Sequence, residues 1–531
     1  MRLTGLPRSP TRRLSRELAF AGAALVGLGL LVFGSYVLHG GFYEDDWGNA
    51  STYRERGYWE MAFDFWLHGK PWRPVLAFLL PLPHALFGLT PSFHLAAGLL
   101  LAILASLGFF VFLRAVGIEL SHAIGLALLA LVFPWSDALR LWATGSLNNI
   151  APMAYFLGAA VALHALRLEP AQQPRRQVLH ALSVVLYLVS LFTYEIAAPA
   201  IALSGLVYRT RVSWSALRAR WQLDAVMVLV WLVAIVYPSS RLHDVRSLSD
   251  RLTSVPESLV QASSLFASVF LPRGITSPVA KLMVLVAVGV ILGTAFRRIR
   301  NGDERELWTW LLRACAGFCA IGVGYVMFLG YGLYPLAEGP ENRINTLSTY
   351  GFVVAAYSVL VVLCLLVARS GAPWFSILLI GGTLLVGVGF IDRVRADAGR
   401  YEASAAQQSE QLATLRRVLP RIPPRTTVFT FGHSLTSGHG VPILDAPWVL
   451  TAAVKLRWND PSLIAVSAVG RDVSCGHDAA RVAFRVAESD QVYAAGYGRA
   501  AFVDLSIPSV RHVHSRHDCR EALAAFRARG R

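Results

Sequence analysis

The feature that most constrains this chain is a series of apolar runs of about 18 residues or more, separated by short polar segments. Hydrophobic residues make up 55% of the 531 residues, and charged residues only 15%. Soluble domains carry about a quarter charged residues. The sequence therefore predicts an α-helical polytopic membrane protein.

Arginine-rich patches indicate how the chain is oriented. Five arginines precede the first apolar run, residues 18–39, and further clusters recur between later runs. Cytoplasmic loops are enriched in Lys and Arg. We therefore expect an integral protein of a bacterial inner membrane, with a cytoplasmic N-terminus and residues 40–70 outside. The net charge of +16 comes from these patches, so no nucleic-acid partner is expected.

About 11 crossings and one juxtamembrane helix follow from this orientation. If residues 72–89 crossed, every later basic patch would fall on the wrong side, so this proline-bearing segment is expected along the outer surface. The expected crossings are residues 18–39, 92–113, 122–134, 150–166, 178–195, 196–208, 223–238, 278–296, 308–330, 350–368 and 373–391.

The final part of the chain is more polar. Residues 1–391 are expected to form the membrane domain, and residues 392–531 a small extracytoplasmic α/β domain. A polar helix is predicted over 393–419, with Leu412, Leu415 and Leu419 on one stripe. Strands are predicted over 428–431, 463–469 and 501–505, and a helix over 478–488. Cys475 and Cys519 could pair in an oxidising compartment, but the sequence leaves this open.

Three consecutive acids, Glu44, Asp45 and Asp46, follow the first apolar run. Acids beside lipid are unfavourable unless they have water, a metal or a cationic partner. A carboxylate within hydrogen-bond reach of an acceptor hydroxyl can act as a general base. We therefore predict a catalytic acid at the boundary of water and lipid. A solvated loop among interfacial aromatic residues is the alternative.

Cationic groups that could bind phosphate lie near this loop. His68, Lys70 and Arg73 are expected at the level of the lipid head groups, where phosphate needs such donors. Interfacial anchoring is the alternative for each of them. In the outer loop 331–349, Arg343 between aromatic residues such as Tyr334 suits a lipid phosphate, with a solvated loop as the alternative.

Two further outer segments carry charge. Asp137 and Arg140 could form a local pair on a helix; alternatively, Asp137 is a second acid facing the first loop and Arg140 binds phosphate. Glu195 ends an apolar run, where an acid is costly unless it faces water or the protein interior. We expect Glu195 to pair with an arginine in a structural role, with a catalytic role as the alternative.

Other functional classes have weaker support. The segment Gly432-His433-Ser434 lacks the G-x-S-x-G elbow of hydrolases and is predicted to be a turn. A transporter or flippase would show inverted repeats and broken helices at mid-membrane, whereas the polar residues here lie at the outer ends of the runs. A non-catalytic partner in envelope assembly is a third reading, and it would tolerate loss of the loop acids.

In combination, these segments resemble the GT-C superfamily of integral-membrane glycosyltransferases over roughly residues 17–390. The stretch Glu44-Asp45-Asp46-Trp47 is similar to the paired acids of that family's first outer loop. Arg73-Pro74 with Leu86-Phe87-Gly88-Leu89 resembles the proline-bearing segment of its bacterial and protein-O-mannosyltransferase-like branches. Phe192-Thr193-Tyr194-Glu195 with Pro199 resembles its "sKE…P" segment, but Tyr194 stands where lysine is usual, which puts any role of that lysine in doubt.

The resemblance implies a polyprenyl-phosphate-linked sugar donor and inverting transfer of a hexose or pentose on the extracytoplasmic face. The acceptor would be a hydroxyl of a glycan, lipid or protein. Asp45 would be the general base, within an acidic group that includes Glu44 and Asp46. Asp46 and Asp137 would support it or hold a divalent cation, Mg or Mn, although the need for a metal stays open. Arg73, Arg140 and Arg343 would hold the lipid phosphate.

Overall fold

The computed structural model describes residues 10–233, 248–301, 304–329, 335–368, 371–438, 440–486 and 489–529. Within these residues, eight helical segments are long and apolar enough to cross a membrane, which confirms a polytopic membrane protein. They are contained in α1 (Pro10–His39), α5 (Pro91–Ala115), α8 with α9 (Ala143–Ser146 and Ile150–Leu166), α10 (Gln173–Thr193), α15 (Pro278–Asn301), α16 (Arg305–Leu329), α17 (Ser348–Val367) and α18 (Pro373–Val418).

The other three predicted crossings take different forms. Residues 122–134 fall mainly in α6 (Leu120–Leu131), which has 12 residues and at about 1.5 Å per residue is shorter than a bilayer core of about 30 Å. Residues 196–208 are broken into η5 (Glu195–Ala197), α11 (Ala198–Ala202) and α12 (Ser204–Arg209). Part of 223–238 lies in α13 (Trp214–Trp231), and residues 234–238 lie outside the described residues.

The segment expected along the outer surface forms short helices. Residues 72–89 contain α3 (Pro74–Leu79) and α4 (Leu82–Phe87), each with a proline at its start, where the missing N–H is not needed. They follow α2 (Asp45–Asp64) and the π-helical turn η1 (Phe65–Gly69). Neither short helix is long enough to cross, in agreement with the prediction.

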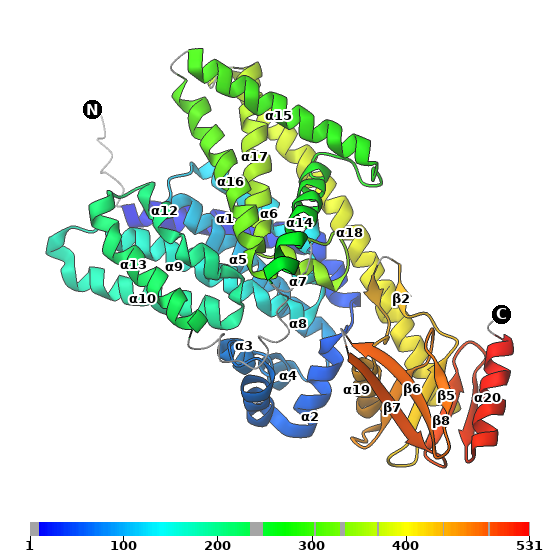
Figure 1. Cartoon of the computed structure of the whole chain (residues 1–531). Coiled ribbons are helices and arrows are strands. Elements are labelled where there is room, and N and C mark those ends of the chain that lie inside the picture. Colours follow the sequence, from blue (N-terminus) through cyan, green and yellow to red (C-terminus); the bar gives the residue numbers. More distant parts are fainter. Residues whose placement is uncertain are drawn as a thin grey trace, which may run out of the picture.

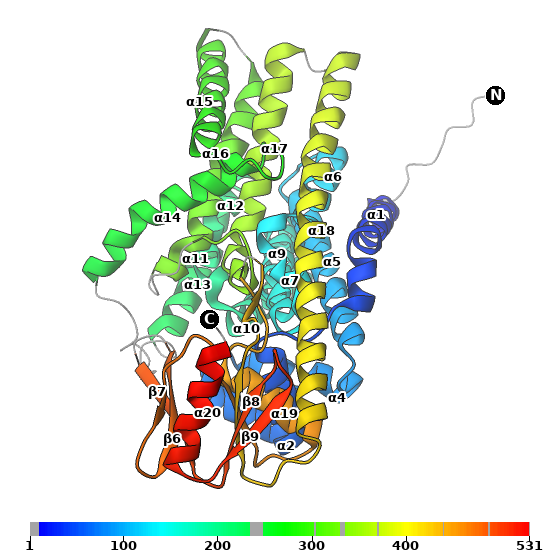
Figure 2. The ribbon, with the colours of Figure 1, turned by 90° about the vertical axis from the view of Figure 1, so that its right-hand side faces the viewer.

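The last span continues into the C-terminal part of the chain. Helix α18 is one helix of 46 residues, and its second half is the polar helix predicted over 393–419. Leu412, Leu415 and Leu419 are buried against the following domain, as predicted. The domain boundary predicted after residue 391 lies inside this continuous helix (Figure 2) and stays a prediction.

The C-terminal domain, from β1 through α20, is built on a sheet of order β4-β1-β8-β9. Strands β1 (Thr427–Phe431), β4 (Ile464–Ser467) and β8 (Ala500–Asp504) are parallel, which confirms the three predicted strands, and β9 (Ser509–Val513) is antiparallel. Residues of α18 and α19 (Pro447–Trp458) form one core with the sheet. Residues of α20 (Arg516–Arg529) form a second core with it.

The helix predicted over 478–488 is wrong. Residues 479–486 form β6 (Ala479–Val486), which pairs with β5 (Val473–Cys475) and β7 (Ser489–Gly496) in an antiparallel sheet. Ala480 and Val482 are buried while Arg481 is exposed, which is the two-residue period of a half-buried strand. The alanines of this stretch fit a helix as well as a strand.

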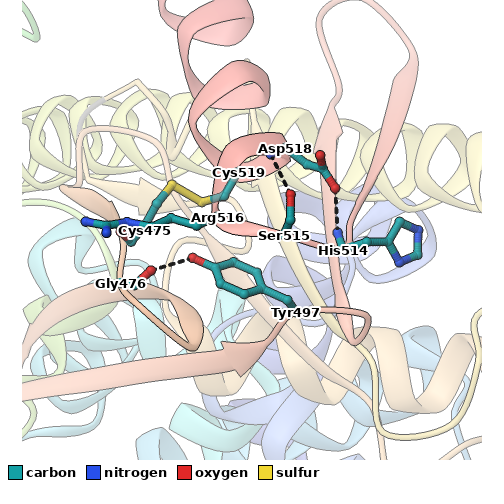
Figure 3. Close-up of a disulfide and its surroundings, with 8 residues drawn as sticks. All are labelled: Cys475, Gly476, Tyr497, His514, Ser515, Arg516, Asp518 and Cys519. Atoms are coloured by element: carbon teal, nitrogen blue, oxygen red, sulfur yellow. Dashed lines mark hydrogen bonds between the residues drawn. A yellow bond between two sulfur atoms is a disulfide. The ribbon is translucent and has the colours of Figure 1, made fainter.

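Cys475 and Cys519 are joined in a disulfide that ties β5 to α20 (Figure 3). The first turn of α20 is fixed by local hydrogen bonds: Ser515 Oγ accepts one from Asp518 N, and Asp518 Oδ2 accepts one from His514 N, both at 3.1 Å. These bonds satisfy N–H groups at the start of the helix. The pairing that the sequence left open is therefore present in the fold.

The first-loop helices and the C-terminal domain lie at the same end of the helical body (Figures 1 and 2). Helix α2 contacts α19, and Lys455 Nζ lies 3.2 Å from Glu55 Oε1 across this contact. Trp47 packs against the core of the C-terminal domain, and its Nε1 donates to Gln408 Oε1 of α18 at 2.8 Å. The acidic loop is thus held between the membrane helices and the C-terminal domain.

Candidate active site

The three consecutive acids of the first loop have three different environments. Asp45 is exposed at the start of α2, and within the described residues its carboxylate accepts no hydrogen bond. Glu44 is half-buried and has a φ of 44°, a region that non-glycine residues seldom occupy. Asp46 is only 1% exposed. Of the three, Asp45 is therefore the carboxylate most open to a substrate.

Asp46 joins the first loop to the segment that carries Thr144. Its Oδ2 accepts a hydrogen bond from Tyr43 N at 3.0 Å, and its Oδ1 accepts one from Thr144 N at 2.7 Å. Burial raises the pKa of Asp46 to about 7, although the hydrogen bonds of Thr144 and Tyr43 oppose the rise. Both oxygens are engaged with backbone donors, so Asp46 fixes the loop that carries Asp45.

An ion pair connects α3 with η5. Arg73 Nε donates to Glu195 Oε2 at 2.6 Å, and Arg73 Nη2 donates to Glu195 Oε1. The guanidinium also lies 4.5 Å from the centre of the Tyr194 ring. Burial alone would raise the pKa of Glu195, but the charge and hydrogen bonds of Arg73 outweigh it and lower that pKa. The expected pairing of Glu195 with an arginine is therefore present, while its structural role stays a prediction.

Two further cations lie within electrostatic reach of this pair. Arg343 lies in η8 (Pro340–Asn345), 4.9 Å from the centre of the Trp142 ring, and donates to Glu341 Oε1 at 3.0 Å. Lys70 is half-buried. The charge of Arg73, followed by burial, lowers the pKa of Lys70 to about 8, with Arg343 adding to the effect. Three cations therefore lie within electrostatic reach of one another.

The exposed acid belongs to the same group. The charges of Glu195 and Asp45 both act on Lys70 and raise its pKa in opposition to Arg73. Burial, followed by the charges of Asp445 and Asp45, raises the pKa of Glu44 to about 8, and Arg343 opposes this. Six predicted residues thus lie within electrostatic reach of at least one other member of the set: Glu44, Asp45, Lys70, Arg73, Glu195 and Arg343. This set combines the Asp45 carboxylate, which has no ion-pair partner in the described part of the chain, with cations able to bind a phosphate.

Four other predicted residues are placed differently. The ring of His68 is 77% exposed and lies 3.1 Å from Asp64 on the far part of α2. Arg140 is 4% exposed and donates to the Phe133 carbonyl and to Ser136 Oγ. Asp137 is 1% exposed and accepts from Asn342 Nδ2 at 2.6 Å. Tyr334 lies outside the described residues.

The two acids considered for a divalent cation do not fit such a site. Both oxygens of Asp46 accept backbone hydrogen bonds, and Oδ1 of Asp137 accepts one from Asn342. In the described part of the chain, no group of three or more His, Cys, Asp or Glu side chains is arranged to hold a metal. Mg²⁺ and Mn²⁺ require several oxygen ligands, so no step is assigned to a metal at these residues.

The sequence did not predict that residues of the C-terminal part of the chain act on the acids of the first loop. Asp445 precedes α19, and its charge acts on Glu44. Its neighbour Leu444 is buried with a φ of 48°, so the backbone is constrained where Asp445 meets the first loop. About 400 residues separate these acids in the chain, and no local pattern links residues so far apart. The sequence also gives no indication that Leu444 has a positive φ.

The comparisons with known proteins give structural neighbours only. No family model matches the chain, and no curated protein matches it. The chain is similar to the crystal structure of the Archaeoglobus fulgidus oligosaccharyltransferase tethered with an acceptor peptide, with 12% identity, 86% of this chain and 64% of that one covered, and a TM-score of 0.44. It therefore spans less than two thirds of that enzyme.

The other similar structures are those of ArnT from Cupriavidus metallidurans. The form bound to undecaprenyl phosphate has 11% identity and a TM-score of 0.37, and the apo form has 13% and 0.39. Each match covers 83% of this chain and 85% of that one. With TM-scores below 0.5, these likenesses carry no argument about function, which is therefore argued from the site.

Proposed function

We propose that this protein is a membrane glycosyltransferase that moves a sugar from a polyprenyl-phosphate carrier to a hydroxyl of a glycan, lipid or protein. The observation that carries the proposal is that the exposed Asp45, which has no ion-pair partner among the described residues, and the cations Arg73 and Arg343 all lie within electrostatic reach of Lys70. A displacement at a glycosyl phosphate needs both a base and cations for the departing phosphate.

The acid and the cations have different roles in the transfer. The Asp45 carboxylate takes the proton from the acceptor hydroxyl, and the hydroxyl oxygen forms a bond to the anomeric carbon. The bond between that carbon and the phosphate oxygen breaks, and the polyprenyl phosphate leaves with the electron pair. Lys70 and Arg343 contact the phosphate, while Arg73, held by Glu195, adds its charge. A single displacement of this kind inverts the configuration of a hexose or a pentose.

We place the site on the extracytoplasmic face of the bacterial inner membrane, with the N-terminus in the cytoplasm. The arginine patches support this orientation. The Cys475–Cys519 disulfide also supports it, because disulfides persist in oxidising compartments. In this orientation the C-terminal domain is extracytoplasmic and the acidic loop meets the carrier where its phosphate lies at the surface.

Separate replacement of the first-loop acids tests the proposal. Asp45→Asn should lose transfer by about 10²–10⁴-fold, the usual contribution of a general base, with unchanged protein level. Asp46→Asn should reduce the amount of folded protein, because its buried oxygens hold two backbone N–H groups. Glu60→Gln, an exposed acid on the same helix, is the matched control.

The readout is the profile of cell-surface glycans, with the protein level measured in the same cells. Loss of one glycan in Asp45→Asn, but not in Glu60→Gln, supports the assignment. An unchanged profile in Asp45→Asn would discard a catalytic role and favour a non-catalytic assembly partner. Continued transport of a lipid-linked sugar without transfer would favour a flippase.

A further inference from the structure

Asp137 fixes the segment that carries Arg343. It lies between the turn η2 (Pro134–Ser136) and α7 (Ala138–Leu141), and it is almost fully buried. Asn342 Nδ2 donates to Asp137 Oδ1 at 2.6 Å, while Asn342 Oδ1 accepts from Ala138 N at 3.1 Å. Both the nitrogen and the oxygen of the Asn342 amide are therefore hydrogen-bonded. Because Arg343 is the next residue, the position of its backbone depends on Asp137.

The second oxygen of Asp137 lacks a donor, and another acid interacts with this side chain. Oδ2 is buried and accepts no hydrogen bond from any donor in the described residues. The side chain of Asp397, on α18, lies within hydrogen-bonding reach of Asp137. Two ionised carboxylates cannot share a buried site without strong repulsion. A proton on one of them removes the repulsion and supplies the missing donor.

The surrounding charges decide where the negative charge remains. Asp397 Oδ1 accepts from Arg400 Nη1 at 2.7 Å, and Arg400 also lies 3.4 Å from Glu338. Asp397 therefore has its own cation, whereas Asp137 has a neutral amide. The other titratable groups that act on the pair are Arg140 of α7, Arg393 and Tyr401 of α18, and Arg273 before α15.

We infer that Asp137 and Asp397 share one proton and that this proton positions Arg343 for the donor phosphate, an inference that rests in its second half on the proposed function. Asp137 is the protonated partner and donates to Asp397. Loss of the proton places two negative charges between η2 and α18. The repulsion displaces Asn342 and, with it, Arg343. Asp137 is a positioning residue, since it does not touch the substrate.

The pH dependence follows from this arrangement. Burial, followed by the charge of Asp397, raises the pKa of Asp137 well above its ordinary value of 3.8. In the unfolded chain Asp137 ionises near 3.8, while in the folded chain it keeps its proton to a higher pH. The unfolded state is therefore increasingly favoured as pH rises. The stability that the pair contributes is greatest below pH 3.8. It decreases as the pH rises from there to the raised pKa of Asp137.

The first test uses Asp137→Asn, whose amide can accept from Asn342 and donate to Asp397 at every pH. The melting temperatures of wild type and variant are measured in detergent from acidic to alkaline pH. We expect the wild type to lose stability relative to the variant as pH rises above about 4. A difference in melting temperature between wild type and Asp137→Asn that does not change with pH would contradict the shared proton. Asp397→Asn, which removes the second acid, should weaken the same pH dependence.

The second test measures positioning. The KM for a polyprenyl-phosphate-linked sugar is followed against pH in Lys70→Arg and in Lys70→Arg/Asp137→Asn, so that titration of Lys70 does not interfere. Glu44 and Asp46 titrate in both proteins. We therefore expect KM to rise with alkaline pH more steeply in the first protein than in the second, by up to about tenfold per pH unit. Identical profiles would overturn the link to Arg343. If the wild type transfers no sugar, the proposed function is wrong. The melting curves still test whether Asp137 and Asp397 share a proton.

Discussion

At the scale of single residues, Lys70 is the cation of the site whose charge changes near neutral pH. Arg73 and burial lower the pKa of Lys70 to about 8. Donor binding should therefore weaken as pH rises through about 8, because the neutral amine loses a charge-assisted hydrogen bond of about 1.5–3 kcal/mol. Lys70→Arg should remove the part of this loss that comes from Lys70, since arginine stays charged.

The measurement is the dissociation constant of polyprenyl phosphate across neutral and alkaline pH, in wild type and in Lys70→Arg. His68→Gln is the control, because His68 is exposed and lies beside Asp64. Its pH profile should match that of the wild type. The ratio of the two dissociation constants, wild type over Lys70→Arg, should rise as pH increases through about 8. A ratio that does not change with pH would show that Lys70 does not contact the phosphate.

Which of the three adjacent acids is open to a substrate could not be predicted from the sequence alone. Glu44, Asp45 and Asp46 are alike in local pattern, and the resemblance to a family favours Asp45 only by position. The difference between them arises from distant contacts: Thr144 holds Asp46, and Asp445 acts on Glu44. The type of residue and its place beside the bilayer were predictable, whereas burial was set by other parts of the chain.

At the scale of elements, the Arg73–Glu195 pair joins α3 to η5. The two side chains are only 12% and 7% exposed. Glu195→Gln would leave the guanidinium buried beside a neutral partner, so we expect it to lower the free energy of unfolding by about 3–5 kcal/mol. Thermal melting in detergent measures this loss.

The exposed pair of Arg511 and Glu521, 3.1 Å apart, provides the control for that experiment. Glu521→Gln should change stability by less than about 1 kcal/mol, as surface pairs do. If Glu195→Gln melted no lower than Glu521→Gln, the Arg73–Glu195 pair would not be a structural connection.

Elements with a long, uniform pattern were predictable, and those with a mixed pattern were not. The apolar runs became helices because lipid leaves the backbone no other partners. Strands β1, β4 and β8 were found because each is a short apolar run. The error at β6 came from a stretch that fits periods of both 2 and 3.6 residues. The continuity of α18 was also missed, because the change from apolar to polar residues inside it resembles a boundary.

At the scale of the whole molecule, the orientation in the membrane can be tested by labelling introduced cysteines. Arg457→Cys lies at an exposed position of α19, and Arg297→Cys at an exposed position near the end of α15. An impermeant maleimide should label Arg457→Cys in intact cells. It should label Arg297→Cys only after the inner membrane is permeabilised, because arginine-rich patches remain cytoplasmic.

The wild-type chain, with its free cysteines at 315, 319 and 364, gives the background of that labelling. The reverse pattern would put the acidic loop in the cytoplasm and would remove any access to a carrier-borne sugar outside. The sequence predicted this orientation from charge alone. It could not predict that the C-terminal domain packs against α2, because that contact depends on Trp47, Lys455 and α18 meeting in space.

The most direct test of the account is a single-turnover transfer with purified protein in vesicles, loaded with a labelled polyprenyl-phosphate sugar and a hydroxyl acceptor. Donor binding and product formation are measured in the same sample for wild type and Asp45→Asn. The account predicts that Asp45→Asn binds the donor as tightly as the wild type but forms product at least about 100-fold more slowly. Product formation by Asp45→Asn at the wild-type rate would contradict it.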